Sequence, residues 1–212
     1  MLQYSLACLL CLFFWGNAAA QSGTTQLRTL KDKGVLLIAL PTRSNKVAAI
    51  HKQLARPDLT AEQRTNWEAR LARVAEDNAR DARLLQQAFA AAYSFSDYRF
   101  TNDTVAVQMR SGAEPAYLLD DMLATVSTDW PTNKPYWIVQ YATRNGMKGL
   151  QVRTADLQPI PTDVEDFYRL NGIGSFFRAL TKPKAEAELI DAQKMVERLD
   201  ARFRRSQRGL PE

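Results

Sequence analysis

Apolar residues follow one another without alternation from Val35 to Leu40. Such a run is typical of a strand that is covered on both faces of its sheet. The segment 136–141, YWIVQY, has the same character apart from Gln140. The two segments therefore predict the central strands of a mixed sheet.

Helical periodicity follows the first strand. Apolar positions at i, i+3 and i+7 from Val47 predict a short helix, which Ser44 or Asn45 would cap. A strand that leads through a short turn into a helix is the unit from which α/β folds are built. We therefore expect a single α/β domain.

Two further helices are predicted. The first begins at Asp58 or Thr60 and continues to about Tyr93, because neither Gly nor Pro interrupts it. Its outer face carries charges of both signs, which indicates a solvated surface and argues against binding of nucleic acid. The second covers 184–205, where apolar residues recur every three or four positions.

Period-two alternation marks the segments between these helices. Tyr98 and Phe100, followed by a TND turn and an alternating segment from Val105 to Met109, predict one hairpin. Asn145-Gly146 is a strong signal for a second hairpin, which joins YWIVQY to GLQVRT. The segment 116–126 fits either a strand or a helical turn.

Residues 1–20 resemble a signal peptide. They carry no charged side chain, have an apolar centre from Leu6 to Trp15, and end in the Ala18-x-Ala20 pattern that a signal peptidase reads. We expect cleavage after Ala20; the alternative is a single-span anchor, for which the apolar run is shorter than the ~20 residues required. The mature chain is then one α/β domain over 21–212, with 21–30 flexible and without a transmembrane segment, and it is periplasmic or secreted.

Composition narrows the possible chemistry. Both cysteines, Cys8 and Cys11, lie in the leader, so the mature chain has neither a disulfide nor a thiol nucleophile. Lys and Arg number 28 against 23 Asp and Glu, which gives a net charge of +5. This excess permits attraction to anionic surfaces, and it equally serves solubility.

Four residues are candidates for ligand binding. Arg43, Ser44 and Lys46 lie near the start of the first helix, where free amide groups favour an anion. The turn has no glycine to wrap a phosphate, and the alternative interpretation is a plain connection between strand and helix. Trp130, which precedes a proline in a loop, is a candidate for stacking on a sugar or a peptide.

Carboxylates are the weak candidates for catalysis. Asp120 and Asp121 are adjacent and could bind a divalent cation, whereas Asp163 and Asp166 would share one helical face. His51 is the one histidine in the sequence, and no partner stands at a diagnostic spacing from it. No metal site and no cofactor is predicted.

Two segments near the carboxyl terminus have a structural interpretation as well as a functional one. NGIGSFF, 171–177, lacks the context of a nucleotide-binding glycine loop and is interpreted as a hinge between two helices. RFRRSQR, 202–208, could touch an anionic lipid or polymer. Its positive charge also suits the carboxyl end of a helix.

Three segments carry a resemblance: LKDKGVLLIALPTRSNKVAAI, LLQQAFAAAYSFSDYRFTND and GLQVRTADLQPI. Through them the chain resembles a family of exported, uncharacterised proteins of Gram-negative bacteria, over much of 29–180. That resemblance implies export and an α/β fold. The family has no assigned activity, so no catalytic residue follows from it.

Two classes of function remain. The first is a non-enzymatic binding or interaction module of the cell envelope, whose partner is an envelope protein or an anionic ligand. The alternative is a carboxylate- or metal-dependent hydrolase or transferase that acts in the periplasm. The lack of an assembled catalytic motif favours the first class.

Overall fold

The structure is a computed structural model that describes most of the chain between residues 25 and 208. The described residues are 25–109, 115, 117–120, 122–126, 134–155, 157–160, 164–169 and 172–208. The predicted signal peptide, residues 1–20, lies outside them.

A seven-stranded mixed sheet forms the centre of the described fold, in the order β4-β3-β2-β1-β5-β6-β7. Its central strands β2, β1 and β5 are parallel, and the outer pairs are antiparallel. The prediction of an α/β fold with a mixed sheet is confirmed, and the two predicted central strands, β1 and β5, are neighbours in it. The strands are β1 (Val35–Leu40), β2 (Asp97–Asn102), β3 (Leu118–Leu119), β4 (Thr125–Val126), β5 (Tyr136–Arg144), β6 (Met147–Thr154) and β7 (Phe167–Arg169).

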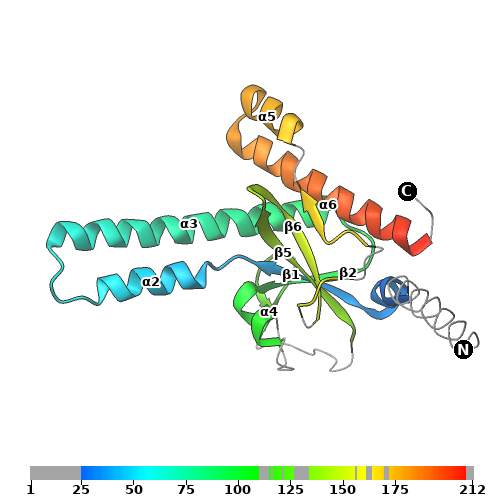
Figure 1. Ribbon diagram of the computed structural model, residues 1–212, viewed down its shortest axis with the longest axis horizontal. Helices are drawn as coiled ribbons and strands as arrows, with labels where there is room; N and C mark the ends of the chain where they lie inside the picture. Colours follow the sequence, from blue (N-terminus) through cyan, green and yellow to red (C-terminus); the bar gives the residue numbers. More distant parts are fainter. Residues whose placement is uncertain are drawn as a thin grey trace, which may run out of the picture.

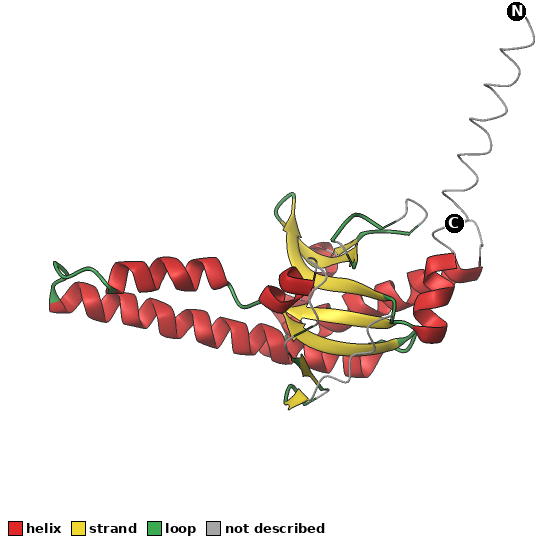
Figure 2. Ribbon diagram, turned by 90° about the horizontal axis from the view of Figure 1, so that it is seen from below, coloured by secondary structure: helices red, strands yellow, loops and turns green. Residues whose placement is uncertain are grey.

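Helices cover both faces of this sheet (Figures 1 and 2). The long helices α3 and α6 pack against each other on one face, and α4 contacts β1 and β2 on the other. The helices are α2 (Ser44–Leu54), α3 (Ala61–Ala92), α4 (Asp103–Met109), α5 (Gly172–Thr181) and α6 (Lys184–Arg208). A further helical segment, residues 25–33, precedes β1.

Strand β1 is buried along its whole length, as predicted. Leu36, Ile38 and Leu40 point into the larger apolar cluster under α3 and α6. The alternate residues, from Val35 to Ala39, join a smaller cluster with α4. Because neighbouring residues of a strand face opposite ways, an apolar run without alternation is what such double burial requires.

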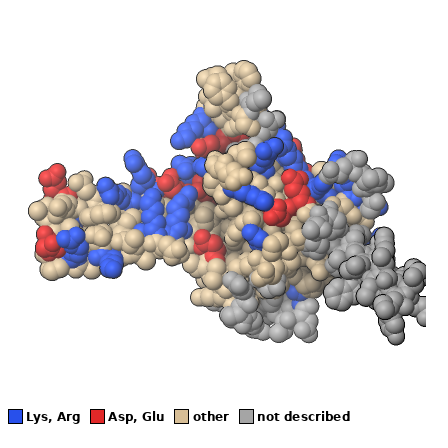
Figure 3. All heavy atoms as spheres, in the orientation of Figure 1, with Lys and Arg blue, Asp and Glu red and all other residues tan. Residues whose placement is uncertain are grey.

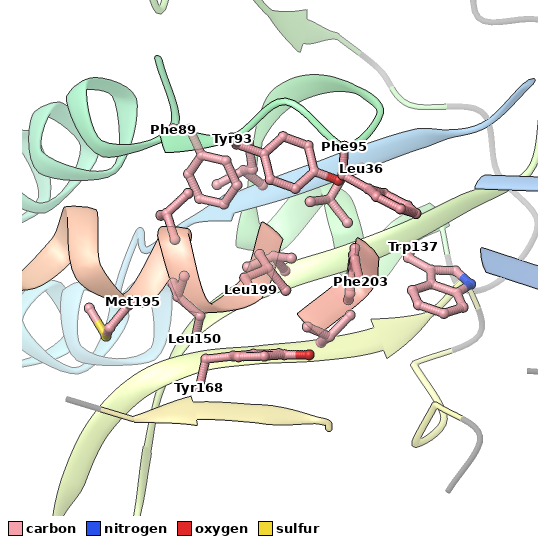
Figure 4. Packing of buried hydrophobic residues seen from close by; sticks show 14 of the residues in the cluster. Leu36, Phe89, Tyr93, Phe95, Trp137, Leu150, Tyr168, Met195, Leu199 and Phe203 are labelled. Atoms are coloured by element: carbon pink, nitrogen blue, oxygen red, sulfur yellow. The ribbon is translucent and has the colours of Figure 1, made fainter. Parts of the chain in front are cut away.

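Helix α6 supplies the centre of the larger cluster (Figure 4). The Phe203 ring is fully buried and meets Phe95 and Trp137 edge-on, at centroid distances of 5.3 and 5.6 Å. Leu199 and Met195 continue this face toward the start of the helix. The predicted 3-4-3-4 spacing of α6 is therefore its core-facing stripe.

The Asn145-Gly146 hairpin is confirmed. Arg144 pairs with Met147, so the loop has two residues, and both have positive φ, 53° and 75°. Two residues in the left-handed region are the requirement of a type I′ turn, which asparagine and glycine meet at little cost.

The other predicted hairpin is wrong. Residues 103–109 form helix α4, in which Val105, Ala106 and Met109 are buried against the sheet while Val107 is exposed. The Asp103 carboxylate accepts a hydrogen bond from the Thr42 amide at 3.2 Å and a second from the Thr42 hydroxyl, which ties the start of the helix to the end of β1. The segment is helical and not a strand because apolar residues at i, i+1 and i+4 can be buried together only on one face of a helix.

Two other segments differ from or refine the sequence prediction. Residues 25–33 are helical, although flexibility was predicted up to residue 30; Leu27 and Leu30 are buried in the larger cluster, which orders the segment. Within 116–126, the described residues include β3 and β4, which pair as a short antiparallel hairpin at the sheet edge.

The predicted long helix is α3, and it protrudes. Its capping box is present, with Thr60 and Gln63 exchanging hydrogen bonds of 3.1 and 3.2 Å. The first half of α3 runs antiparallel to α2, and together they form an arm that projects from the sheet (Figure 1). Ile50 and Val74 are the buried apolar residues of this two-helix arm.

We predict that Phe203→Ala lowers the free energy of unfolding by about 3–5 kcal/mol, because it leaves a cavity among packed rings. Phe176→Ala is the matched control, since Phe176 is exposed; it should change stability by less than about 0.5 kcal/mol. Urea denaturation followed by circular dichroism measures both. Equal losses would contradict this description of the core.

Candidate functional site on helix α5

The turn between β1 and α2 is held within the fold. Arg43 has a left-handed backbone, with φ 51°, and occupies the N-cap position of α2. Its side chain makes no capping hydrogen bond to the helix. The prediction of Ser44 or Asn45 as the cap is therefore wrong. The Arg43 guanidinium donates to the Asn78 side chain and pairs with Asp81 at 2.5 Å. Ser44 and Lys46 are exposed. Anion binding by Arg43, Ser44 and Lys46 stays a prediction, although the charge of Arg43 already has a partner.

The structure does not bring the two described carboxylate candidates together. Asp120 accepts amide hydrogen bonds from Met122 and Ala124, both 2.9 Å, in the turn between β3 and β4. Asp166 pairs with Arg144 at 3.0 Å beside β7, at the opposite edge of the sheet. Asp121, Asp163 and Trp130 lie outside the described residues.

The remaining candidates for enzyme chemistry are also unassembled. His51 is exposed on α2, within the arm. Burial, together with the negative charges of Asp81 and Glu188, raises the pKa of Tyr141 to about 12, so its hydroxyl stays protonated at neutral pH. Within the described ranges, no group of three His, Cys, Asp or Glu side chains is placed to hold a metal ion.

A cavity of about 640 Å³ lies between the 25–33 helix and the start of β5. Hydroxyl and amide groups such as those of Thr29 and Gln158 line it beside the Trp137 ring. The cavity is at the amino ends of β1 and β5, whereas ligands of open α/β sheets bind outside the carboxyl ends of the strands. Its lining indicates no particular chemistry.

Helix α5 is attached to the fold by its polar face. Asp191 of α6, itself buried, accepts hydrogen bonds from Ser175 Oγ at 2.5 Å and from Arg178 Nε at 2.6 Å. The side chains of Arg178 and Asp191 are only 14% and 10% exposed, so this ion pair is largely shielded from water. Removing one partner of such a shielded pair is costly, because the other charge is then left without compensation.

The apolar face of α5 points into solvent. Phe176, Phe177 and Leu180 are 61%, 60% and 67% exposed, and the two rings contact each other edge-on at 5.9 Å. An amphipathic helix ordinarily buries this face and exposes its charges. On α5 the arrangement is reversed: the helix projects from the fold (Figure 1), and its exposed side chains include two Phe and one Leu. In Figure 3 this projection is drawn mainly in the tan of residues other than Lys, Arg, Asp and Glu.

Basic side chains follow this projection along the chain. Lys182 pairs with Glu186, and the largely exposed Lys184 lies 4.0 Å from Glu188. Because both pairs are exposed, their attraction is weak and either lysine can turn toward another anionic group at small cost.

Sequence reasoning missed this surface, although the sequence contained its signal. Ile173, Phe176, Phe177 and Leu180 are spaced i, i+3, i+4 and i+7, which is one helical face. The two glycines directed the interpretation to a hinge. Which face of α5 is buried depends on Asp191, which is distant in sequence, so the pattern alone predicts the opposite orientation.

Comparison of the chain with protein-family models, with curated proteins and with solved structures gave no match. Among the described helices, none combines the length and the apolar character needed to cross a membrane. What the α5 surface does must therefore be inferred from its own residues.

We predict that Asp191→Asn releases α5, because it leaves the shielded Arg178 without its counter-charge. The loss of about 3 kcal/mol should accelerate amide hydrogen exchange over 172–181 by about a hundredfold. Glu186→Gln, on the exposed side of α6, is the control and should leave the exchange unchanged. Slow exchange in the Asp191→Asn variant would show that something other than this pair holds the helix.

Proposed function

We propose that the protein is an exported, non-enzymatic module of the cell envelope that docks on a phospholipid surface through α5. The observation that carries this proposal is the outward apolar face of a helix that is fixed by its polar face. Export and the envelope location rest on the predicted leader. A compartment reached in that way is bounded by membranes.

Burial of the apolar face of α5 against another surface would be energetically favourable. Full burial of one Phe or Leu side chain is worth about 1.5–3 kcal/mol. Phe176, Phe177 and Leu180 are all more than half exposed, so most of this energy is unused in the described fold. Because Asp191 already orders α5, docking does not have to supply the free energy of forming the helix.

The size and shape of the patch favour a membrane over a protein partner. Three side chains at these exposures offer roughly 350 Å² of apolar surface. A stable protein interface uses about 800 Å² on each partner, so a second copy of the chain would bury too little through α5 alone. Amphipathic helices that present Phe and Leu insert into the boundary between headgroups and acyl chains, and their length is not what decides this.

Charge supports the same choice. Lys182 and Lys184 directly follow α5 in the chain, and the whole sequence has a net charge of +5. Lysine stems can lie along the apolar surface while their ammonium groups reach lipid phosphates. Three inserted side chains give weak, reversible attachment.

We predict that the protein beginning at Gln21 floats with vesicles of phosphatidylethanolamine and phosphatidylglycerol in a density gradient. Phe176→Ser combined with Phe177→Ser should weaken vesicle binding by at least about tenfold, since each ring contributes one decade or more when buried. Val107→Ser is the matched control, because Val107 is also 61% exposed but lies on α4. Its binding should equal that of the unchanged protein.

Two outcomes of the flotation experiment would overturn the proposal. One is an unchanged protein that stays at the bottom of the gradient with every vesicle composition. The other is a double serine variant that floats as well as the unchanged protein. If sedimentation velocity showed a dimer that the double variant loses, α5 would instead be an interface between copies.

A further inference from the structure

A second cavity, of about 270 Å³, lies between β7 and α6. It is separate from α5, which packs against the beginning of α6. Its lining includes a single acidic residue and four arginines among the described residues: Glu165, Tyr168, Arg169, Arg198, Arg202 and Arg205. Arg169, Arg198 and Arg205 are exposed, so water screens their mutual repulsion, but together the guanidinium groups attract anions to this small volume.

Helical spacing brings the arginines together. Arg198, Arg202 and Arg205 occupy positions i, i+4 and i+7 of α6, and so share one face. That face adjoins the core stripe of Leu199 and Phe203, which fixes its direction. Arg169 ends β7, and the Arg198 guanidinium donates to its backbone oxygen at 3.1 Å. The cavity is therefore positioned by two elements of regular structure.

Three of the four arginines that line this cavity lack an acidic partner within the described part of the chain. No carboxylate there pairs with Arg169, Arg198 or Arg205. Glu165 lines the cavity but is exposed and forms no ion pair with any described residue. Surface arginines elsewhere, such as Arg43 and Arg144, do have acidic partners.

Tyr168 provides an independent observation. Its side chain is only 2% exposed, it lines the cavity, and its buried hydroxyl has no hydrogen-bond partner in the described structure. The ring lies at the edge of the core beside Phe203 (Figure 4). Burial raises the pKa of Tyr168, so the hydroxyl keeps its proton and is a donor without an acceptor. Such groups are rare in folded proteins and ask for an explanation.

We propose that this cavity binds a phosphoryl group, the terminal phosphate of a phosphomonoester. Planar guanidinium groups match phosphate oxygens in pairs, and a tetrahedral dianion can accept hydrogen bonds from both α6 and β7. The Tyr168 hydroxyl would donate to one of these oxygens. The volume suits a phosphate with a small substituent and is below that of sites for drug-sized ligands.

The same chemistry has two sources, a soluble phosphate ester and the headgroup of phosphatidic acid. Calorimetric titration of the protein from Gln21 with glycerol 3-phosphate tests the first source. Vesicles that contain phosphatidic acid test the second. The Phe176→Ser, Phe177→Ser variant should bind glycerol 3-phosphate as well as the unchanged protein does, so failure at α5 is distinguishable from failure here.

We predict that Arg198→Gln combined with Arg205→Gln weakens binding of the phosphomonoester by at least about tenfold, because two charge-assisted contacts are lost. Tyr168→Phe should weaken it by about fivefold or more. It should not lower the melting temperature of the ligand-free protein, since the removed hydroxyl has no partner in the fold. Arg83→Gln, which removes an exposed arginine of α3, is the control and should bind normally.

Three results would overturn the proposal. The first is that neither glycerol 3-phosphate nor phosphatidic acid vesicles bind in a way that depends on the cavity arginines. The second is that the Tyr168→Phe variant binds as tightly as the unchanged protein. The third is that Arg83→Gln weakens binding as much as the cavity variants do, because general surface charge would behave in that way. Binding to phosphatidic acid alone, lost in the Arg198, Arg205 variant, supports the site with a lipid as its source.

Discussion

The burial of β1 on both faces is the constraint on which the rest of the structure depends. One side of the strand faces α3 and α6, and the other faces α4. Each face must be covered by a different helix, and this determines how the chain connects its elements. Helix α3 leads back to the sheet so that β2 lies beside β1, and α4 begins directly at the end of β2. The turn after β1 completes this arrangement, because Thr42 and Arg43 bond to residues of both α3 and α4.

Helix α6 has a different role on each of its sides. Its apolar stripe closes the core, its early polar residue Asp191 holds α5, and its later arginines face β7. The two candidate surfaces are thus arranged on a helix that cannot shift without disturbing Phe203. A rigid support of this kind is what binding sites require, because groups that are already in place lose little freedom when a ligand arrives.

Much of the fold follows from local pattern, and the candidate sites do not. The central strands, the long helix with its capping box, the Asn145-Gly146 hairpin and the last helix each depend on residues close in sequence. The sequence pattern of α4 predicted a strand because its seven residues fit both the strand period of two and the helical period of 3.6. Packing against β1 favours the helix. The outward face of α5 depends on Asp191, and the arginine cavity depends on β7 lying beside α6. Such long-range relations have no local signature, although the clusters of arginine and phenylalanine were visible.

The continuity of α3 has a mechanical consequence. Its 32 residues form one helix about 48 Å long, and no hinge separates the half that packs on the sheet from the half that forms the arm. The arm itself has a thin apolar seam, with Ile50 and Val74 as its buried side chains, so its direction is set at the base. A force applied to the tip of the arm near Pro57 would therefore turn α3 as a rigid lever about the bonds of Arg43. The other end of the helix, with Leu85 and Phe89, would transmit that force to the core.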